Sequence, residues 1–312
     1  MKYYIAMDAG GTKTDGVLFD ENGRVLYCLS GPGVNPNDIG PDAAVKALSR
    51  QLERLSGAAG NDISGAFAAI AGIVGYGDGL CERLREKSGI PCLTAGTDAL
   101  PLLTGVLGRS DGAALVAGTG SVCFVRRGDE LCRIGGWGYL IDPSSSGSGF
   151  DIGRDGLAAA LHAHDGQGPR TVLTSMAGRA LGCPVWEAIP RIYSGGRSYI
   201  AAFAGAVFSG AGAGDPICRD ILRRNCEGLC AMLRAATGYL KPPFAVALGG
   251  GILTHYPVYA DMLRAMAPEG LELRMMDGPA VLGAAMEAVY RSGGELCDDF
   301  NVNFNESWRN SC

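Results

Sequence analysis

Two short turns rich in glycine and threonine carry the residues best suited to bind phosphate. The first turn is Asp8-Ala9-Gly10-Gly11-Thr12-Lys13-Thr14, directly after an apolar run, and the second is Gly118-Thr119-Gly120-Ser121. Glycine lets the backbone approach a ligand closely, and successive N–H groups can cradle phosphate oxygens. The hydroxyls of Thr12 and Thr14 and the ammonium of Lys13 can add donors. Either turn alone could be an ordinary hairpin turn, but two in equivalent places favour a phosphate site.

Three further features could complete such a site. Asp8, at a strand end, is placed to hold Mg²⁺ through water, because hard cations prefer carboxylate oxygens. Asp98, in the run GTDA, lies where a strand gives way to a helix. It could accept a proton from a substrate hydroxyl, or it could serve only as a helix N-cap. Gly249-Gly250-Gly251 precedes a helix whose N-terminus could contact a nucleotide, although close helix–strand packing alone could require these glycines.

Several other kinds of site are disfavoured by the residue pattern. No G-x-x-x-x-G-K-[ST] motif occurs, and both Gly-rich turns lead into strands, unlike the turn of a dinucleotide-binding fingerprint. His162 and His164 would point to different faces of a helix, which argues against a shared metal ion. Cys226 and Cys230, one helical turn apart, are expected to pack in the core.

Composition excludes further classes of function. The net charge is −5 and no basic run occurs, so nucleic acid is not an expected partner. The N-terminal apolar run is too short for a signal peptide or a membrane span, and no membrane association is expected. Eleven cysteines with no C-x-x-C pair indicate reduced thiols in a cytoplasmic protein, rather than a disulfide framework or a zinc site.

The elements that must position these residues recur in two α/β halves. Residues 3–8 are predicted to form a buried strand, followed by the Gly/Thr turn and a hairpin with Asn22-Gly23 at its tip. Residues 112–138 repeat this order of strand, glycine turn and two further strands. Residues 41–56 have helical spacing, and the chain beyond residue 150 is mostly helical, with a closing helix near 279–291. The tail, 297–312, shows no clear period, and its role stays open.

The chain length suggests two domains, since single cores rarely exceed ~250 residues. We predict one domain over residues 1–110, joined by the C-terminal segment 293–312, and a second domain over residues 111–292. The first would carry the first phosphate turn and Asp98, and the second would carry the other two Gly-rich turns.

In this order, the motifs resemble the sugar kinase, heat-shock ATPase and actin superfamily. More narrowly, DAGGTKTD, GTDA, GTGS, GGWG and SGFDIGRDG resemble the N-acetylglucosamine kinase and BadF/BcrA ATPase family, from about residue 3 to 290. The resemblance implies two ribonuclease H-like α/β domains, as in actin and hexokinase, with a nucleotide cleft between the domains.

The resemblance also implies roles for individual residues. Residues 10–14 and 118–121 would bind the phosphates of ATP, Gly249–Gly251 would form an adenosine-side loop, and Gly210 would lie near the nucleotide. Asp98 would be the general base. The substrate side would be formed by Asn35, Gly136, Trp137, Gly138 and Asp142. Trp137 could stack on a sugar or merely anchor its loop.

One loop departs from the family pattern. Relatives carry an acidic GDEGSG or DEGGSG after GGWG, whereas this chain has IDPSSSGSG, about two residues longer. Either the loop is simply lengthened by turn-forming residues, or Asp142 accepts a hydrogen bond from a sugar hydroxyl. We favour the second alternative. The FDIGRDG that follows is expected to start a helix.

The implied activity is ATP- and Mg²⁺-dependent phosphorylation of an amino sugar, N-acetylglucosamine or glucosamine, by a homodimer. The other branch of the family implies an alternative, an ATPase activator of a 2-hydroxyacyl-CoA dehydratase with an iron–sulfur cluster held by cysteines. Cys123 and Cys132 show no clear cluster pattern, so the kinase is favoured. A sugar sensor without catalysis is disfavoured, because the first strand starts at residue 3 and leaves no room for a DNA-binding domain. The hexosamine and the hydroxyl that is phosphorylated stay open.

Overall fold

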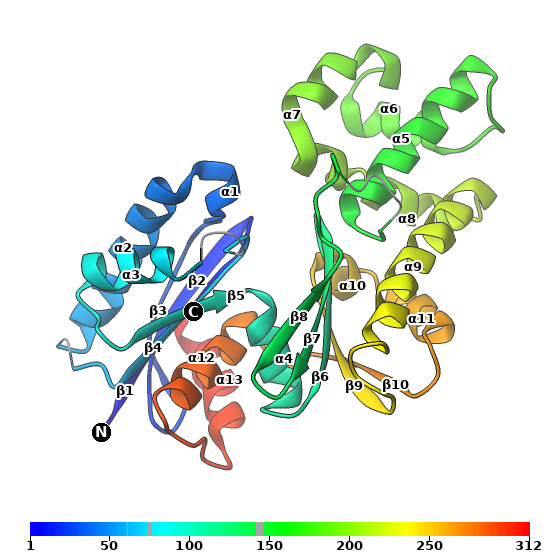
Figure 1. Cartoon of the computed structure of the whole chain (residues 1–312). Helices are drawn as coiled ribbons and strands as arrows, with labels where there is room; N and C mark the ends of the chain where they lie inside the picture. Colours follow the sequence, from blue (N-terminus) through cyan, green and yellow to red (C-terminus); the bar gives the residue numbers. More distant parts are fainter. Residues whose placement is uncertain (61, 74–76, 142–145) are drawn as a thin grey trace. The chain divides into compact units, whose positions relative to one another are not determined.

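The chain divides into two compact units, each built on one five-stranded sheet. The computed structural model describes residues 1–60, 62–73, 77–141 and 146–312 (Figure 1). Unit 1 contains Met1–Ser110 and Met276–Cys312, and unit 2 contains Asp111–Met275.

The sheet of unit 1 has the order β3-β2-β1-β4-β5. Strands β1 (Tyr3–Ala9), β2 (Lys13–Asp20) and β3 (Val25–Pro32) form an antiparallel meander. Strands β4 (Gly65–Ile70) and β5 (Leu93–Thr97) continue the sheet in parallel to β1. Because β1 lies at the centre, it is buried on both faces and reads as an apolar run.

Helices cover both faces of this sheet. Alternate residues of β1, beginning with Ile5, pack against α2 (Pro41–Ala58) and α3 (Gly77–Ser88). The residues in between pack against α12 (Ala280–Arg291) and α13 (Phe300–Ser311). The short helix α1 (Pro36–Ile39) precedes α2, and α4 (Ala99–Leu107) follows β5.

The sheet of unit 2 repeats the same plan. Its order is β10-β9-β6-β7-β8, with β6 (Gly112–Ala117), β7 (Ser121–Arg127) and β8 (Glu130–Ile134) forming the antiparallel meander. Strands β9 (Phe244–Gly249) and β10 (Leu271–Met275) are parallel to β6. The structure thus confirms the repeat of strand, glycine turn and two further strands.

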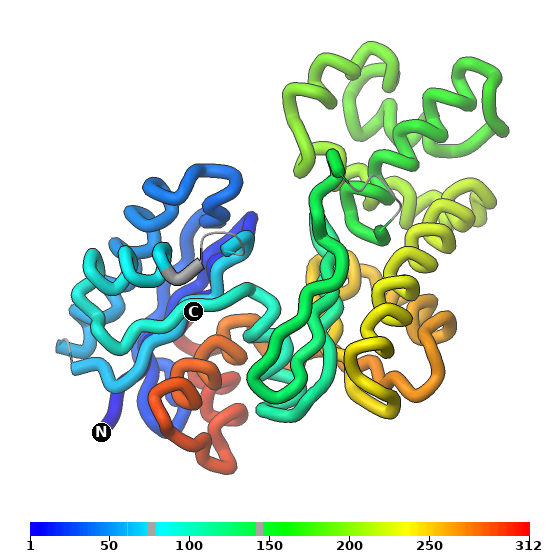
Figure 2. The backbone as a smooth tube through the Cα atoms, in the orientation of Figure 1, coloured from blue at the N-terminus to red at the C-terminus, as the bar shows by residue number. Residues whose placement is uncertain are grey.

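Unit 2 is rich in helices, as the sequence predicts beyond residue 150. Figure 2 shows the backbone of these helices as a tube coloured along the sequence. They are α5 (Gly149–Asp165), α6 (Leu173–Leu181), the single 3₁₀ turn Val185–Glu187, α7 (Ile189–Ala202), α8 (Ala204–Gly212), α9 (Pro216–Ala236), α10 (Gly251–His255) and α11 (Pro257–Met266). No helix of the described residues has the length and apolarity that a membrane span requires.

The domain boundary expected at residue 292 differs from the structure, in which unit 2 ends at Met275. Helix α12, which the sequence analysis assigned to the second domain, lies in unit 1. There it packs on β1, β4 and α4, so its apolar face completes the core of unit 1. Gly283 permits this close packing, because a Cβ at that position would collide with the backbone of Pro101.

The C-terminal tail, in which the sequence shows no clear period, is a packed helix. Phe300 and Phe304 are buried, and their ring centroids lie 5.9 and 6.0 Å from that of Phe19 on β2. Ser307 Oγ also accepts a hydrogen bond from the N–H of Val25 at 2.9 Å. The four-residue spacing of these aromatic side chains forms one helical face.

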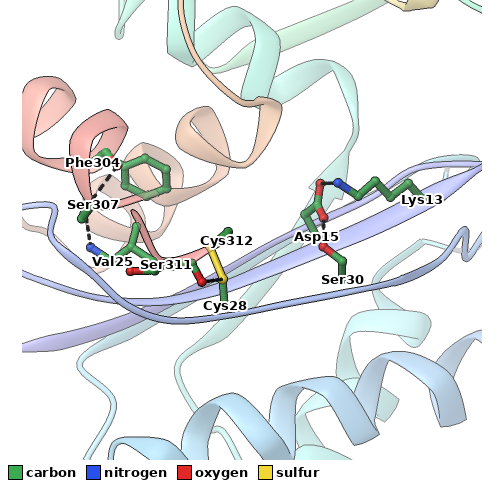
Figure 3. Close-up of a disulfide and its surroundings, with 9 residues drawn as sticks. All are labelled: Lys13, Asp15, Val25, Cys28, Ser30, Phe304, Ser307, Ser311 and Cys312. Atoms are coloured by element: carbon green, nitrogen blue, oxygen red, sulfur yellow. Dashed lines mark hydrogen bonds and ion pairs between the residues drawn. A yellow bond between two sulfur atoms is a disulfide. The ribbon is translucent and has the colours of Figure 1, made fainter. Parts of the chain in front are cut away.

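A disulfide joins this helix end to the meander, which corrects the expectation of reduced thiols throughout. Cys28 on β3 is bonded to Cys312, with their Cα atoms 6.0 Å apart (Figure 3). The pairing could not be read from the sequence, because the two residues are 284 positions apart. Cys226 and Cys230 are free and buried in the core of unit 2, as expected.

Candidate phosphate and substrate sites

The Gly-rich turn between β1 and β2 leaves backbone donors unused. The Gly10 N–H donates to the Lys13 carbonyl at 2.9 Å, and the Val34 N–H donates to the Gly10 carbonyl at 3.0 Å. Within the described part of the chain, the N–H groups of Gly11 and Thr12 make no backbone hydrogen bond of this kind. Both residues are exposed. The turn therefore offers two adjacent amides to an anion.

Lys13 is held beside this turn by an ion pair. Its Nζ lies 3.0 Å from Oδ2 of Asp15, and Ser30 Oγ on β3 donates to Oδ1 of Asp15 at 2.5 Å (Figure 3). The Lys13 side chain is 61% exposed, and an exposed pair contributes only ~0–1 kcal/mol to stability. The ion pair therefore orients the Lys13 ammonium. Because the pair is weak, breaking it so that the ammonium can contact a phosphate costs little free energy. Asp15 is not among the site residues predicted from the sequence.

Thr14 differs from the other predicted donors of this turn. Successive strand residues face opposite sides of a sheet, so Thr14 points away from the side that carries Lys13 and Asp15. Its side chain is fully buried, and its hydroxyl has no hydrogen-bond partner among the described residues. The structure thus places the hydroxyls of Thr12 and Thr14 apart, and only Thr12 is exposed at the turn.

Carboxylates gather at the same end of the sheet. Asp8 lies directly opposite Asp15 in the pairing of β1 with β2, and Asp98 directly follows β5. The pKa of Asp8 is raised to about 7, mainly by burial and then by the charges of Asp98 and Asp15, while Lys13 lowers it. A cation would relieve this repulsion, and oxygen donors are what Mg²⁺ takes. The described residues contain no group of three acidic, histidine or cysteine side chains that could hold a metal ion directly, so this end of the sheet fits Mg²⁺ only if water mediates the contact with Asp8.

Asp98 stands at the N-cap position of α4 but does not cap the helix. Its side chain makes no hydrogen bond to the helix N–H groups. Instead, its Oδ1 accepts a hydrogen bond from the hydroxyl of Thr97 at 3.0 Å, and the side chain is partly exposed. Capping therefore does not account for the carboxylate, and proton acceptance is chemically open to it.

Asn35 has a structural role that the sequence analysis did not give it. Its Oδ1 accepts a hydrogen bond from the Asn37 N–H at 2.9 Å and so caps α1. Asn37 in turn donates to the Gly72 carbonyl at 3.2 Å. Within the described residues the Asn35 Nδ2 makes no hydrogen bond. The Nδ2 group of Asn35 is therefore available to donate a hydrogen bond to a substrate.

The equivalent turn of unit 2 lies between β6 and β7. Its Gly118 N–H donates to the Gly120 carbonyl at 2.8 Å. The carbonyls of Gly118 and Thr119 accept from the N–H groups of Gly149 and Phe150, in the first turn of α5, at 2.7 and 3.2 Å. In the part of unit 2 that the structure describes, the N–H groups of Thr119 and Gly120 are not used in this way. This turn also offers two amides to an anion.

The predicted adenosine-side loop lies beside this turn. Gly250 has a φ of 88°, and a Cβ there would collide with the backbone of Ala117. A Cβ on Gly118 would lie 3.8 Å from the backbone nitrogen of Gly251. The structure thus brings the two loops together, and close backbone packing explains the glycine at position 250.

A buried network that sequence reasoning missed supports the same turn. Ser121 Oγ donates to the Ser146 carbonyl at 2.8 Å, and Ser146 Oγ donates to Oδ2 of Asp151 at 2.5 Å. Asp151 is buried in the first turn of α5, accepts from Ser148 Oγ at 2.5 Å and pairs with Arg154 at 3.3 Å. The FDIGRDG run starts a helix as predicted, and its carboxylate anchors the serines that precede it.

The GGWG run forms a turn that displays Trp137. Gly135, Gly136 and Gly138 have φ values of 70°, 71° and 98°, a region that strongly favours glycine. Arg133 donates to the carbonyls of Gly135 and Gly136, and its Cζ lies 4.8 Å from the centroid of the Trp137 ring. The indole is 58% exposed. It is therefore held from one side and open to solvent elsewhere.

One predicted residue is not brought to these turns. Gly210 is buried where α8 meets α9, and a Cβ there would collide with Sγ of Cys218. Its lack of a side chain is thus explained by helix packing. Asp142 lies outside the described residues.

Comparisons with known proteins agree with this architecture. The profile of the BadF/BadG/BcrA/BcrD ATPase family matches residues 5–288. The chain is 27% identical over 282 residues to an N-acetylmuramic acid/N-acetylglucosamine kinase of Clostridium acetobutylicum, covering 85% of this chain and 90% of that protein.

Two solved structures show the same fold. A candidate N-acetylglucosamine kinase of Chromobacterium violaceum has a TM-score of 0.72 at 24% identity, covering 92% of this chain and 98% of the other. A ROK family glucokinase of Streptomyces griseus, solved with glucose and AMPPNP, has a TM-score of 0.61 at 18% identity, covering 92% and 99%. The predicted α/β fold of two actin-like domains is confirmed. Because the family profile spans most of its length, the chain belongs to the BadF/BadG/BcrA/BcrD ATPase family.

Proposed function

We propose that this protein is a kinase that uses ATP and Mg²⁺ to phosphorylate an amino sugar, with N-acetylglucosamine as its substrate. The observation that carries the proposal is the pair of equivalent Gly-rich turns. Each joins the first two strands of a meander, in two sheets of the same order, and each leaves two N–H groups unused within the described residues. Membership of an ATPase family and the likeness to sugar kinases support it.

In this proposal the N–H groups of Gly11, Thr12, Thr119 and Gly120 bind phosphate oxygens. Positioning and charge stabilisation supply most of the catalysis in phosphoryl transfer, so preorganised amides suit the reaction. Mg²⁺, when bound, neutralises charge on the phosphates. Asp8 would hold it through water.

Asp98 is proposed as the general base. Its carboxylate is partly exposed, and its Oδ1 accepts a hydrogen bond from the Thr97 hydroxyl. An ionised carboxylate can accept about four hydrogen bonds, so a further bond from the hydroxyl of a substrate is compatible with its chemistry. It would take the proton of the sugar hydroxyl as that oxygen attacks the terminal phosphorus of ATP, while the bond from this phosphorus to the bridging oxygen breaks and ADP leaves. Asn35, Asp142 and the 136–138 turn are proposed to contact the sugar.

The activator branch of the family is not favoured. Cys123, on β7, is fully buried in the core of unit 2, and burial raises the pKa of its thiol to about 12. Iron–sulfur clusters are held by thiolates, so a buried thiol with a raised pKa is poorly suited to hold one.

A panel of hexoses and hexosamines in an ADP-release assay tests the proposal. We expect ADP release with Mg²⁺ that depends on N-acetylglucosamine, and weaker release with glucose. Absence of sugar-dependent ADP from every hexosamine would refute it. Phosphorus NMR of the product identifies the hydroxyl that is phosphorylated. On the family resemblance we also propose a cytoplasmic homodimer, and light scattering of the purified protein tests the dimer.

A further inference from the structure

Arg197 of α7 lies against the phosphate turn of unit 2. A Cβ built on Gly120 would lie 3.3 Å from the guanidinium Cζ and would collide with Nη2. The guanidinium therefore occupies the space where any other residue at position 120 would carry its side chain. It lies next to a turn whose Thr119 and Gly120 amides are unused within the described chain.

The path of α7 explains how Arg197 reaches this place. Gly196 has φ 64° and ψ −157°, which breaks the helix one residue before Arg197. Such a backbone conformation is costly for residues other than glycine. A new helical segment begins at Arg197 after the break, and the break sets the position of the Arg197 Cα, from which the side chain extends.

A second contact holds the guanidinium at the loop that follows GGWG. The Cζ of Arg197 lies 5.7 Å from the centroid of the Tyr139 ring. The ring of Tyr139 packs in turn on Phe150, in the first turn of α5, with centroids 4.8 Å apart. Arg197 thus touches both the phosphate turn and the loop on the predicted substrate side.

The charge of Arg197 is not compensated by a carboxylate in the part of unit 2 that the structure describes. The nearby Arg154 pairs with Asp151 and Asp155, and Arg133 donates to two carbonyls. Arg197 forms no ion pair with a described residue. A guanidinium beside free amide donors makes a site for an anion, and the planar fork of arginine matches phosphate oxygens.

The turn has two distinguishable ends. Gly118 lies beside Gly251 of the predicted adenosine-side loop, whereas Gly120 lies beside Arg197. A nucleotide that follows the turn from the Gly251 side would reach Arg197 with its last phosphate. We propose that Arg197 binds the terminal phosphoryl group of ATP, which is the group transferred to the sugar. This inference rests on the proposed function.

Calorimetric binding of AMPPNP and ADP, each with Mg²⁺ and without sugar, tests this role. Loss of one charge-assisted contact weakens binding by about 10- to 100-fold. We expect that loss for AMPPNP with Arg197→Ala, a change of less than ~3-fold for ADP, and partial recovery of AMPPNP affinity with Arg197→Lys. In turnover, kcat should fall while KM for the sugar changes little. Arg170→Ala, another exposed arginine of unit 2, is the matched control.

The possible outcomes separate this inference from the proposed function. Unchanged AMPPNP affinity in Arg197→Ala, or an equal loss for AMPPNP and ADP, would overturn the assignment of Arg197 and leave the kinase proposal standing. Failure of the unmodified protein to bind either nucleotide would overturn both. Because Arg197 is exposed, the variants are expected to fold, and circular dichroism verifies this.

Discussion

Asp8 and Asp15 face each other directly across β1 and β2, at the end of the sheet where Asp98 follows β5. Desolvation and the two neighbouring carboxylates together raise the pKa of Asp8 to about 7. An aspartate in the unfolded chain titrates near ~3.9. The folded, metal-free protein therefore binds a proton at Asp8 that the unfolded chain has released between these two pH values.

This difference predicts how stability depends on pH. Where the native state binds more protons than the unfolded state, the free energy of unfolding falls as pH rises. From pH 4 to pH 8, Asp8→Asn should therefore gain stability relative to the unmodified protein by on the order of 4 kcal/mol. Urea unfolding in the absence of Mg²⁺ measures it, with the exposed Asp38→Asn as control. A stability difference that does not vary with pH would contradict the assignment.

Asp98→Asn should reduce turnover by at least ~10²-fold, the lower end for loss of a general base. The amide keeps the shape of the side chain but cannot take the proton, so nucleotide binding should be retained. Thr97→Val, which removes only the hydrogen bond to Oδ1, should have a much smaller effect on turnover. Single-turnover kinetics and calorimetry separate the two quantities. Near-normal turnover in Asp98→Asn would exclude the role of base.

Asp151→Ala should destabilise unit 2 without removing a group that touches ATP. It leaves Ser146, Ser148 and Arg154 without their buried acceptor, which costs about 2–4 kcal/mol. Asp165→Ala, an exposed aspartate at the other end of α5, should be close to neutral. Thermal unfolding followed by circular dichroism compares the two variants. Equal midpoints would show that the serine network contributes nothing to stability.

The sheets were predictable because their signals are local. An apolar run followed by a Gly/Thr turn predicts a strand that ends in a tight turn, and this pattern occurs at both β1 and β6. Its repetition predicted two similar sheets. Thr14 shows the limit of such reasoning. Its residue type suits phosphate, but strand alternation turns its hydroxyl into the core.

Contacts between segments distant in sequence could not be predicted. Gly210 matched a family glycine near the nucleotide, yet its neighbour is Cys218 of the next helix. The placement of α12 in unit 1 depends on tertiary packing rather than on its own pattern. Arg197 carries no local signal at all, because its position depends on the break at Gly196 and on a turn far upstream. The four-residue spacing of Phe300, Phe304 and Trp308 was a readable signal for α13.

Trp137 offers a direct test of the substrate side of unit 2. Its ring is supported by Arg133 and is 58% exposed, so a sugar could stack on it. Trp137→Ala should raise KM for N-acetylglucosamine by about 10-fold, as expected for loss of an aromatic contact of 1–1.5 kcal/mol. KM for ATP should stay unchanged. Leu140→Ala, a more exposed apolar residue of the same loop, is the control and should leave both values unchanged. If Trp137→Ala lowers the melting temperature but not the affinity for sugar, the indole only anchors its loop.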